Sequence, residues 1–412
     1  MADLYVKEFD MINPFVIASS PATQGVYAVL KSAKSLPGAI VMRNFGHGAG
    51  GGSYTTPSVD AMSKGMPASQ IHAVGTQIKD FFSNLEEYCE GVSKTRKKMP
   101  KEVKLWASVG HFSDTVNSGI SWETEWARQA KELELAGADA LELHFNTPGV
   151  STARNRVYDF YRMIYNTIKL IKNVVKIPVM VKLPVEACDP LRAIEAAVFG
   201  GADGIGPTAR WKGFVFDLDW EKTQARPGSG YGGSQALPIA CYVTAETRMN
   251  GIKTPMYTGG GVYSWEAAAK IIMSGSQCVQ LGTVACCIGP RAVSELIKGF
   301  NNWMDQKGYK DIESLRGEAL QLFNLPKVTS DERTKRLGKA YKVTEPDKNL
   351  CIGCGKCIDA CWFEGMNLTD GLAEKTKKCI GCGYCFQVCP TGALKVQAGE
   401  ILASPFDEGK QV

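Results

Sequence analysis

The chain has 412 residues, a formal net charge of +5, and 44% hydrophobic and 22% charged residues, as in an ordinary soluble globular protein. No uninterrupted apolar stretch approaches the ~20 residues of a transmembrane helix, the N-terminus carries charges where a signal peptide needs an apolar run, and no basic run is dense enough to indicate nucleic-acid binding. We therefore expect a cytoplasmic protein with no membrane span and no nucleic-acid partner.

Short β-branched runs alternate with helical stretches through residues 1–300, which is the pattern of parallel βα units. Three of the expected helices end at Gly137, Gly201 and Gly275, and glycine is the residue that most easily adopts the left-handed conformation of a helix stop. These features predict a (β/α)8 TIM barrel, whose catalytic groups lie at the C-terminal ends of its strands. The eight expected strands are Phe15–Ser19, Ala39–Arg43, Leu105–Gly110, Ala140–Phe145, Val179–Leu183, Gly204–Pro207, Met256–Thr258 and Val279–Leu281.

Two glycine features follow the last two expected strands. Gly259, Gly260 and Gly261 come after the seventh strand, with Ser264 as the expected N-cap of the next helix, and Gly282-Thr283 comes after the eighth. In TIM barrels these two loops form the usual phosphate site, because glycines let backbone N–H groups approach the anion at a helix N-terminus. An ordinary turn is the alternative, and the positions favour a phosphate site.

Beyond the barrel the sequence predicts helices at Arg291–Gly308 and Ile312–Leu325, followed by a polar, lysine-rich stretch over 326–350. Two long loops are expected on the catalytic side of the barrel, Gly46–Ser69 and Ala209–Leu237. We therefore divide the chain into a barrel domain over 1–308, a helical or extended linker over 309–345, and a third segment over 346–412.

The third segment contains eight regularly spaced cysteines. Each of two runs has the spacing C-x2-C-x2-C-x3-C, and Pro390 follows the second run, whereas Trp362 follows the first. In ferredoxins with this pattern each run supplies three thiolates to one [4Fe–4S] cluster and its fourth to the other. Zinc ribbons use paired C-x2-C knuckles, and together with disulfides they are the less favoured alternatives. We expect one cluster on Cys351, Cys354, Cys357 and Cys389, and a second on Cys379, Cys382, Cys385 and Cys361.

The remaining six cysteines are scattered, as is usual for buried thiols in a reducing cytosol. We therefore interpret 346–412 as a bacterial-type ferredoxin-like domain with two [4Fe–4S] clusters. No G-x-G-x-x-G sequence follows an expected strand, so any nicotinamide-binding partner lies on another chain.

Several short pieces of the barrel segment form a recognisable combination. They are residues 13–15 and 18–20, Leu141-Glu142-Leu143, Val181-Lys182-Leu183-Pro184, 201–204, Tyr231-Gly232-Gly233-Ser234, Gly259-Gly260-Gly261 and Gly282-Thr283. With these pieces the chain resembles the FMN-dependent dihydroorotate dehydrogenases, and more closely the iron–sulfur catalytic part of dihydropyrimidine dehydrogenase and its bacterial counterpart subunit. The similarity covers nearly the whole chain, with a barrel followed by a two-cluster ferredoxin.

The resemblance implies an FMN at the top of the barrel. Ala18 and Ser19 would approach the isoalloxazine, and Lys182 would lie near its N1/O2 edge, where a cation stabilises the negative charge of reduced flavin. It also implies a redox partner, either a ferredoxin or an NAD(P)H/FAD reductase subunit, and a homo- or hetero-oligomer. The cofactor-binding residues carried over from the family are Ala18, Ser19, Ser20, Asn44, Lys182, Thr208, Gly232, Gly233, Gly259, Gly260, Gly261, Gly282 and Thr283.

The chain departs from the family at the expected substrate site. Thr147 stands where the family has a proton-transferring Cys or Ser, and it either relays a proton with help or has lost that role. His144 stands where an Asn reads the pyrimidine, and Arg43 replaces a flavin-side Lys. Ala209 and Arg210 replace an Asn-Thr pair. We take Thr147, His144, Arg43 and Arg210 as candidate catalytic residues.

Loss of the amide readers and gain of cations predict an anionic, carbonyl-conjugated substrate in place of a pyrimidine. His47 and His111 are expected near the same mouth. The predicted reaction is hydride exchange between FMN and a carbon β to a carbonyl group, with electrons passing through the clusters to or from the partner. Two alternatives stay open: an electron-transfer subunit whose flavin is only a relay, and a true dihydropyrimidine dehydrogenase subunit.

Overall fold

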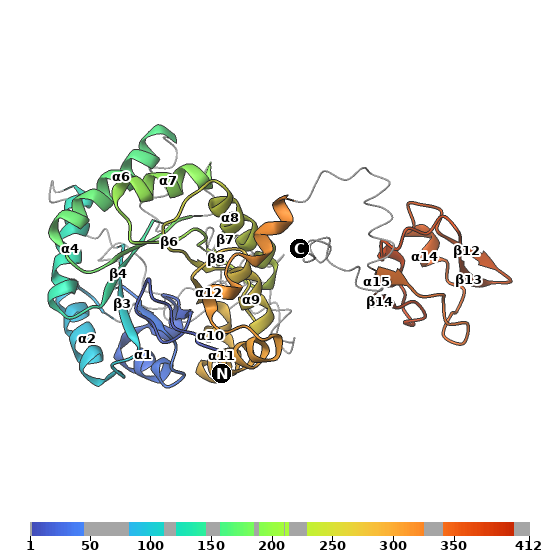
Figure 1. Cartoon of the computed structure of the whole chain (residues 1–412), viewed down its shortest axis with the longest axis horizontal. Coiled ribbons are helices and arrows are strands. Elements are labelled where there is room, and N and C mark those ends of the chain that lie inside the picture. The colour runs from blue at the N-terminus through green and yellow to red at the C-terminus, as the bar shows by residue number, and fades with distance from the viewer. Residues whose placement is uncertain are drawn as a thin grey trace, which may run out of the picture. The chain divides into compact units, whose positions relative to one another are not determined.

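The computed structural model describes residues 2–44, 82–110, 121–145, 157–184, 189–209, 211–213, 229–324 and 341–398. The chain forms two compact units, Met1–Leu322 and Phe323–Val412 (Figure 1). No helix in the described ranges combines the length and the apolar character needed to cross a membrane.

The first unit is an eight-stranded parallel barrel. Neighbouring strands pair in the order β6-β5-β4-β3-β2-β1-β10-β9, and a parallel bridge between Ile205 and Met256 joins the two ends of this sheet. The predicted TIM barrel and its eight strands are confirmed, with shifts of one or two residues at their ends. The strands are β1 (Phe15–Ile17), β2 (Ala39–Met42), β3 (Lys104–Val109), β4 (Ala140–His144), β5 (Val179–Lys182), β6 (Gly204–Gly206), β9 (Tyr257–Gly259) and β10 (Cys278–Leu281).

Helices surround these strands on the outside (Figure 1). The predicted stops are confirmed, since Gly137, Gly201 and Gly275 have φ of +96°, +93° and +107° at the ends of α4, α7 and α9. Ser264 caps α9 as predicted, because its side chain accepts the Ala267 N–H. The helices are α1 (Gly25–Ala33), α2 (Leu85–Lys98), α4 (Trp122–Leu135), α6 (Val157–Val174), α7 (Pro190–Gly200), α8 (Leu237–Met249), α9 (Trp265–Met273), α10 (Thr283–Cys287) and α11 (Pro290–Lys307).

Successive side chains along each strand point to opposite sides of the sheet, so the core of the barrel unit has two layers. Outward residues such as Phe15 and Ile17 pack against the helices, whereas inward residues such as Val16 and Trp106 fill the barrel. The inward positions of β6 are glycines because their neighbours are large: a Cβ at Gly206 would lie 2.9 Å from the Tyr257 ring.

The segments beyond the last strand differ in part from expectation. The helix expected at Arg291–Gly308 is confirmed as α11, but the one expected at Ile312–Leu325 is wrong as a single element. The chain forms α12 (Ile312–Leu315) and then a 3-10 helix, η5 (Glu318–Asn324), because Gly317 between them has φ +76°.

The two expected long loops are described only in part. Residues 46–69 lie outside the described residues. Within 209–237 the structure has an antiparallel hairpin, β7 (Trp211–Gly213) and β8 (Ser229–Tyr231), and a short 3-10 helix, η4 (Ser234–Ala236).

The second unit is a small ferredoxin-like module. β11 (Tyr341–Val343) pairs antiparallel with β14 (Val396–Ala398), β12 (Met366–Thr369) pairs with β13 (Leu372–Lys375), and the helices are α14 (Lys356–Asp359) and α15 (Tyr384–Gln387). Its core is formed by Val343, Cys357, Met366, Ala373, Cys385 and Leu394. Two of these core members, Cys357 and Cys385, belong to the two cysteine runs, so the runs pack into the core of this unit.

Candidate functional site

The loop after β1 is held rigidly at the C-terminal rim of the barrel. The Ala18 N–H donates to the Leu281 carbonyl of β10 at 2.8 Å, and the Thr23 hydroxyl donates to the Ala18 carbonyl at 3.2 Å. The Ser20 N–H in turn donates to the Thr23 hydroxyl at 3.0 Å. Ala18 and the half-buried Ser19 and Ser20 therefore form a fixed backbone platform between neighbouring strands.

Two glycines after β9 allow close packing against the start of α8. Gly260 has φ +119° and Gly261 has φ +75°. A Cβ at Gly261 would lie 2.4 Å from the Leu237 backbone nitrogen, a distance that real atoms do not adopt. These glycines let the β9 loop pack against the first turn of α8. This packing explains why glycine is required here, and the sequence motif alone does not reveal it.

Two other glycines border free space. Among the described residues, a Cβ at Gly282 would have one neighbour within 4 Å, the Ala18 Cβ at 4.0 Å, and a Cβ at Gly232 would meet the Thr283 hydroxyl at 3.5 Å. The loops after β1, β8 and β10 therefore meet around a space bordered by backbone and small side chains. Such a border suits a phosphate group, which backbone N–H groups and a hydroxyl can approach closely.

Lys182 and His144 are neighbours on the same rim. They are register partners at the ends of β5 and β4, and the Phe145 N–H donates to the Lys182 carbonyl at 3.2 Å. Lys182 is buried, with 9% of its surface exposed. The Thr208 hydroxyl donates to the Gly259 carbonyl, joining the β6 and β9 ends of the rim. A lysine and a histidine side chain therefore stand side by side at the C-terminal rim of the barrel.

The expected residues differ in how far the structure describes them. Arg43 directly follows β2, and its backbone N–H donates to the Thr23 carbonyl at 3.1 Å, which places it beside the platform formed by the β1 loop. Thr147, Arg210, His47 and His111 lie outside the described residues. All the expected cofactor-binding residues lie at the rim: Ala18, Ser19, Ser20, Asn44, Lys182, Thr208, Gly232, Gly233, Gly259, Gly260, Gly261, Gly282 and Thr283.

The sequence reasoning missed a polar group beneath this rim. Glu142 of β4 is fully buried, and its Oε2 accepts a hydrogen bond of 2.7 Å from the Gln280 amide of β10. Alternation along β4 contained the signal, because Glu142 lies two residues before His144 and therefore points to the same side.

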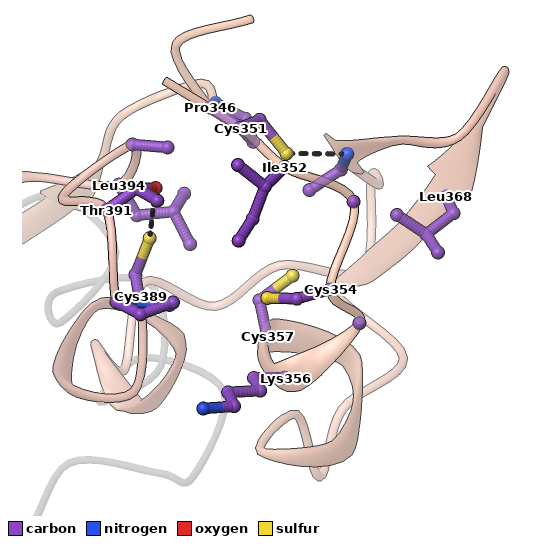
Figure 2. Close-up of a pocket in the computed structure, with 15 residues that line it drawn as sticks. Pro346, Cys351, Ile352, Cys354, Lys356, Cys357, Leu368, Cys389, Thr391 and Leu394 are labelled. Carbon is purple, nitrogen blue, oxygen red and sulfur yellow. Dashed lines mark hydrogen bonds between the residues drawn. The ribbon is translucent and has the colours of Figure 1, made fainter.

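The second unit brings its eight cysteines together in two groups of four. One hollow of about 360 Å³, open mouth included, is lined by Cys351, Cys354, Cys357 and Cys389 (Figure 2). A second hollow of about 280 Å³ is lined by Cys361, Cys379, Cys382 and Cys385. Each hollow takes three thiols from one run and the fourth from the other run.

Glycines shape the turns that present these thiols. Gly353 and Gly355 in the first run have φ of +66° and +73°, and Gly381 and Gly383 in the second have +75° and +84°. Backbone N–H groups also face the sulfurs, since the Gly365 N–H donates to the Cys361 Sγ at 3.0 Å. Hydrogen bonds of this kind stabilise thiolate ligands of iron–sulfur clusters.

The described thiols do not form a site for a single metal ion. Among the described residues no three Cys, His, Asp or Glu side chains are close enough to hold a single metal ion. The described cysteines are also free of disulfides. Burial, followed by the neighbouring Cys379 and Cys382, raises the pKa of Cys385 to about 11. Its thiolate therefore requires a nearby positive charge to be stable at neutral pH.

Comparison with known proteins gives two family matches. Residues 1–304 match the family model described as dihydroorotate dehydrogenase, and residues 375–395 match that of a 4Fe-4S binding domain. The second match covers only the second cysteine run.

Individual relatives span different parts of the chain. The catalytic subunit of dihydroorotate dehydrogenase B (NAD(+)) from Alkaliphilus metalliredigens is 31% identical over 194 residues, which are 47% of this chain and 64% of that relative. The NAD-dependent dihydropyrimidine dehydrogenase subunit PreA of Escherichia coli is 24% identical over 380 residues, 89% of this chain and 86% of the relative. The dihydroorotate dehydrogenase B catalytic subunit of Pyrococcus abyssi is 22% identical over 311 residues, 75% of this chain and 96% of the relative.

Proposed function

The chain belongs to the dihydroorotate dehydrogenase family of FMN-binding barrels and carries a 4Fe-4S binding domain, and on that premise we propose that it is an oxidoreductase acting on CH–CH bonds. Its substrate would be an anionic compound with a carbon–carbon bond conjugated to a carbonyl group. Electrons would pass between the barrel and a partner protein through two [4Fe–4S] clusters. The observation that carries the proposal is the juxtaposition of Lys182 and His144 beside the small-residue rim.

The rim supports FMN binding through its own geometry. Gly282 leaves open space beside Ala18, and Thr283 with Gly232 borders the same space, so a phosphate can be reached by backbone N–H groups and one hydroxyl. Lys182 would then neutralise negative charge at the N1/O2 edge of the ring. When bound, FMN supplies hydride exchange with a substrate carbon β to a carbonyl group.

The substrate proposal rests on what this chain has at the family's pyrimidine-reading positions. An imidazole at position 144 replaces an amide of the family, a guanidinium at 43 replaces a lysine, and Ala209-Arg210 replace an Asn-Thr pair. A site built to pair amide edges loses much of its selectivity when those partners are absent, whereas Arg pairs well with carboxylate. His144, or a group in the Thr147 loop, would exchange the proton at the α-carbon.

The cysteine groups support two clusters. We propose that Cys351, Cys354, Cys357 and Cys389 hold one, and Cys361, Cys379, Cys382 and Cys385 the other, because these sets line the two hollows. The crossover of the fourth cysteine follows from the compact core that the two runs share.

A second candidate function is a dihydropyrimidine dehydrogenase subunit. The similarity to PreA over 89% of this chain favours it, because an alignment of 380 residues is longer than the barrel unit, Met1–Leu322. In that case the substrate would be uracil or thymine, and His144 would have to replace an amide in reading it.

Anaerobic purification with FMN, iron and sulfide analysis tests the proposal. We expect about one FMN and about eight irons per chain. The protein is then mixed with an α,β-unsaturated carboxylate or acyl thioester, its saturated form, uracil, or a reduced ferredoxin, and flavin absorbance is followed. Bleaching or reoxidation by the anionic compounds supports the proposal. Uracil turnover that His144→Asn increases would favour the pyrimidine function, and a response only to the redox protein would favour a relay.

A further inference from the structure

A carboxylate is buried inside the barrel below its C-terminal rim. Glu142 has no exposed surface, and the Gln280 amide that donates to its Oε2 comes from β10, four strands away on the opposite wall. The other oxygen, Oε1, has no hydrogen-bond partner among the described residues. The Tyr257 hydroxyl lies nearby without reaching hydrogen-bond geometry, and the carboxylate adds to burial in raising the pKa of Tyr257 well above its ordinary value.

Lys182 lies on the strand next to this carboxylate. The pairing of β4 with β5 sets Glu142 beside Met180 and His144 beside Lys182. Met180 belongs to the inner core of the barrel, so Lys182, two residues further along β5, points inward as well. With strands about 4.8 Å apart and a rise of about 3.3 Å per residue, the Cα atoms of such diagonal neighbours are roughly 8 Å apart, a separation that a lysine side chain can span.

Both groups are buried, and both are ionisable. Glu142 is fully buried and Lys182 is 9% exposed, and the inner core beneath them consists of side chains such as Val16, Trp106 and Met180. A lone charge in such surroundings is strongly disfavoured, whereas opposite charges in neighbouring positions compensate each other. One amide hydrogen bond from Gln280 is too little to compensate a full carboxylate charge.

We propose that Glu142 is a positioning residue that acts as the counter-charge of Lys182 and thereby lowers the redox potential of the flavin bound above it. The proposal rests on the FMN site proposed above. A fixed negative charge below Lys182 weakens the attraction of that lysine for the negative charge that reduction adds to the flavin. Loss of the carboxylate would therefore favour the reduced state.

Glu142→Gln tests this, because it removes the charge and keeps an oxygen that can accept the Gln280 amide. The readout is the midpoint potential of FMN in the full-length holoprotein, measured anaerobically. We expect at least a tenfold shift toward reduced flavin, about +30 mV for a two-electron couple. Lys182→Met lowers the potential, and in that background Glu142→Gln produces a clearly smaller shift because the coupling acts through Lys182. Glu125→Gln, a buried glutamate on α4 paired with Arg128, leaves the potential unchanged.

An unchanged or lowered potential in Glu142→Gln overturns the proposal, as does an equal shift with and without Lys182. If Glu142→Gln alone does not fold, the double variant carries the test. The double variant must then have a higher free energy of unfolding than Lys182→Met, because it lacks the buried Glu142 charge that Lys182→Met leaves without its counter-charge. A double variant that is no more stable than Lys182→Met overturns the proposal. Wild-type protein without FMN would overturn this proposal together with the proposed function, whereas bound FMN with an unshifted potential overturns this one alone.

Discussion

Replacement of Gly282 by alanine separates cofactor binding from folding. The residue has φ −108°, outside the left-handed region that favours glycine, and among the described residues the added Cβ would meet only the Ala18 Cβ, at 4.0 Å. The free energy of unfolding of the FMN-free protein should therefore change by less than about 1 kcal/mol. With FMN present, the same methyl group would occupy space that the phosphate needs.

The expected loss of FMN affinity follows from the contacts at risk. A hydrogen bond from a backbone N–H to a charged group contributes about 1.5–3 kcal/mol, so losing one weakens binding roughly 10- to 100-fold. The assay is a titration of FMN-free protein with FMN, followed by flavin fluorescence, alongside urea unfolding. Gly308→Ala is the matched control. Gly308 has φ +77°, an added Cβ would have no neighbour within 4 Å among the described residues, and the residue is not one of those proposed to bind FMN. This variant should therefore lose stability and keep its FMN affinity. Unchanged FMN affinity in Gly282→Ala would refute the placement of the phosphate.

Three further outcomes are expected. Gly261→Ala should lower the free energy of unfolding in urea by at least about 2 kcal/mol more than Gly308→Ala does. Both variants strain a positive φ, but only Gly261→Ala forces a Cβ to 2.4 Å from the Leu237 nitrogen. Equal losses of stability would contradict that packing. Cys389→Ser and Cys361→Ser should each reduce the iron content to about half, whereas Cys241→Ser, the control, should keep it. Full iron content in Cys389→Ser or Cys361→Ser would contradict the assignment of four cysteines to each hollow. The hydrogen bond from Lys131 and the N–H groups of Lys176 and Ile177 lower the pKa of Glu134, so its contribution is present above the ordinary carboxyl pKa and lost as pH falls through the lowered value. Glu134→Gln should therefore lose about 1 kcal/mol of stability at pH 7 and converge with wild type in acid, and a constant difference across pH would exclude this origin.

The barrel could be predicted because its signals are local. Strand runs, helix stops such as Gly201 and caps such as Ser264 act within a few residues, and each was found where the sequence indicated it. The misjudged element, Ile312–Leu325, failed for a local reason too, since Gly317 adopts a positive φ that the surrounding helical pattern does not reveal.

The sequence by itself determined the fold class, the spacing of the cysteine runs and the loops that surround the proposed FMN. Only the tertiary structure decided which distant residues meet. The hydrogen bond between Glu142 and Gln280 joins positions 138 residues apart, and it arises because barrel closure turns two alternating strand patterns toward one interior. The grouping of Cys389 with Cys351, Cys354 and Cys357, by contrast, was expected from the spacing of the two runs. The structure adds the hollow that these four cysteines line, which forms because the two runs pack into one core.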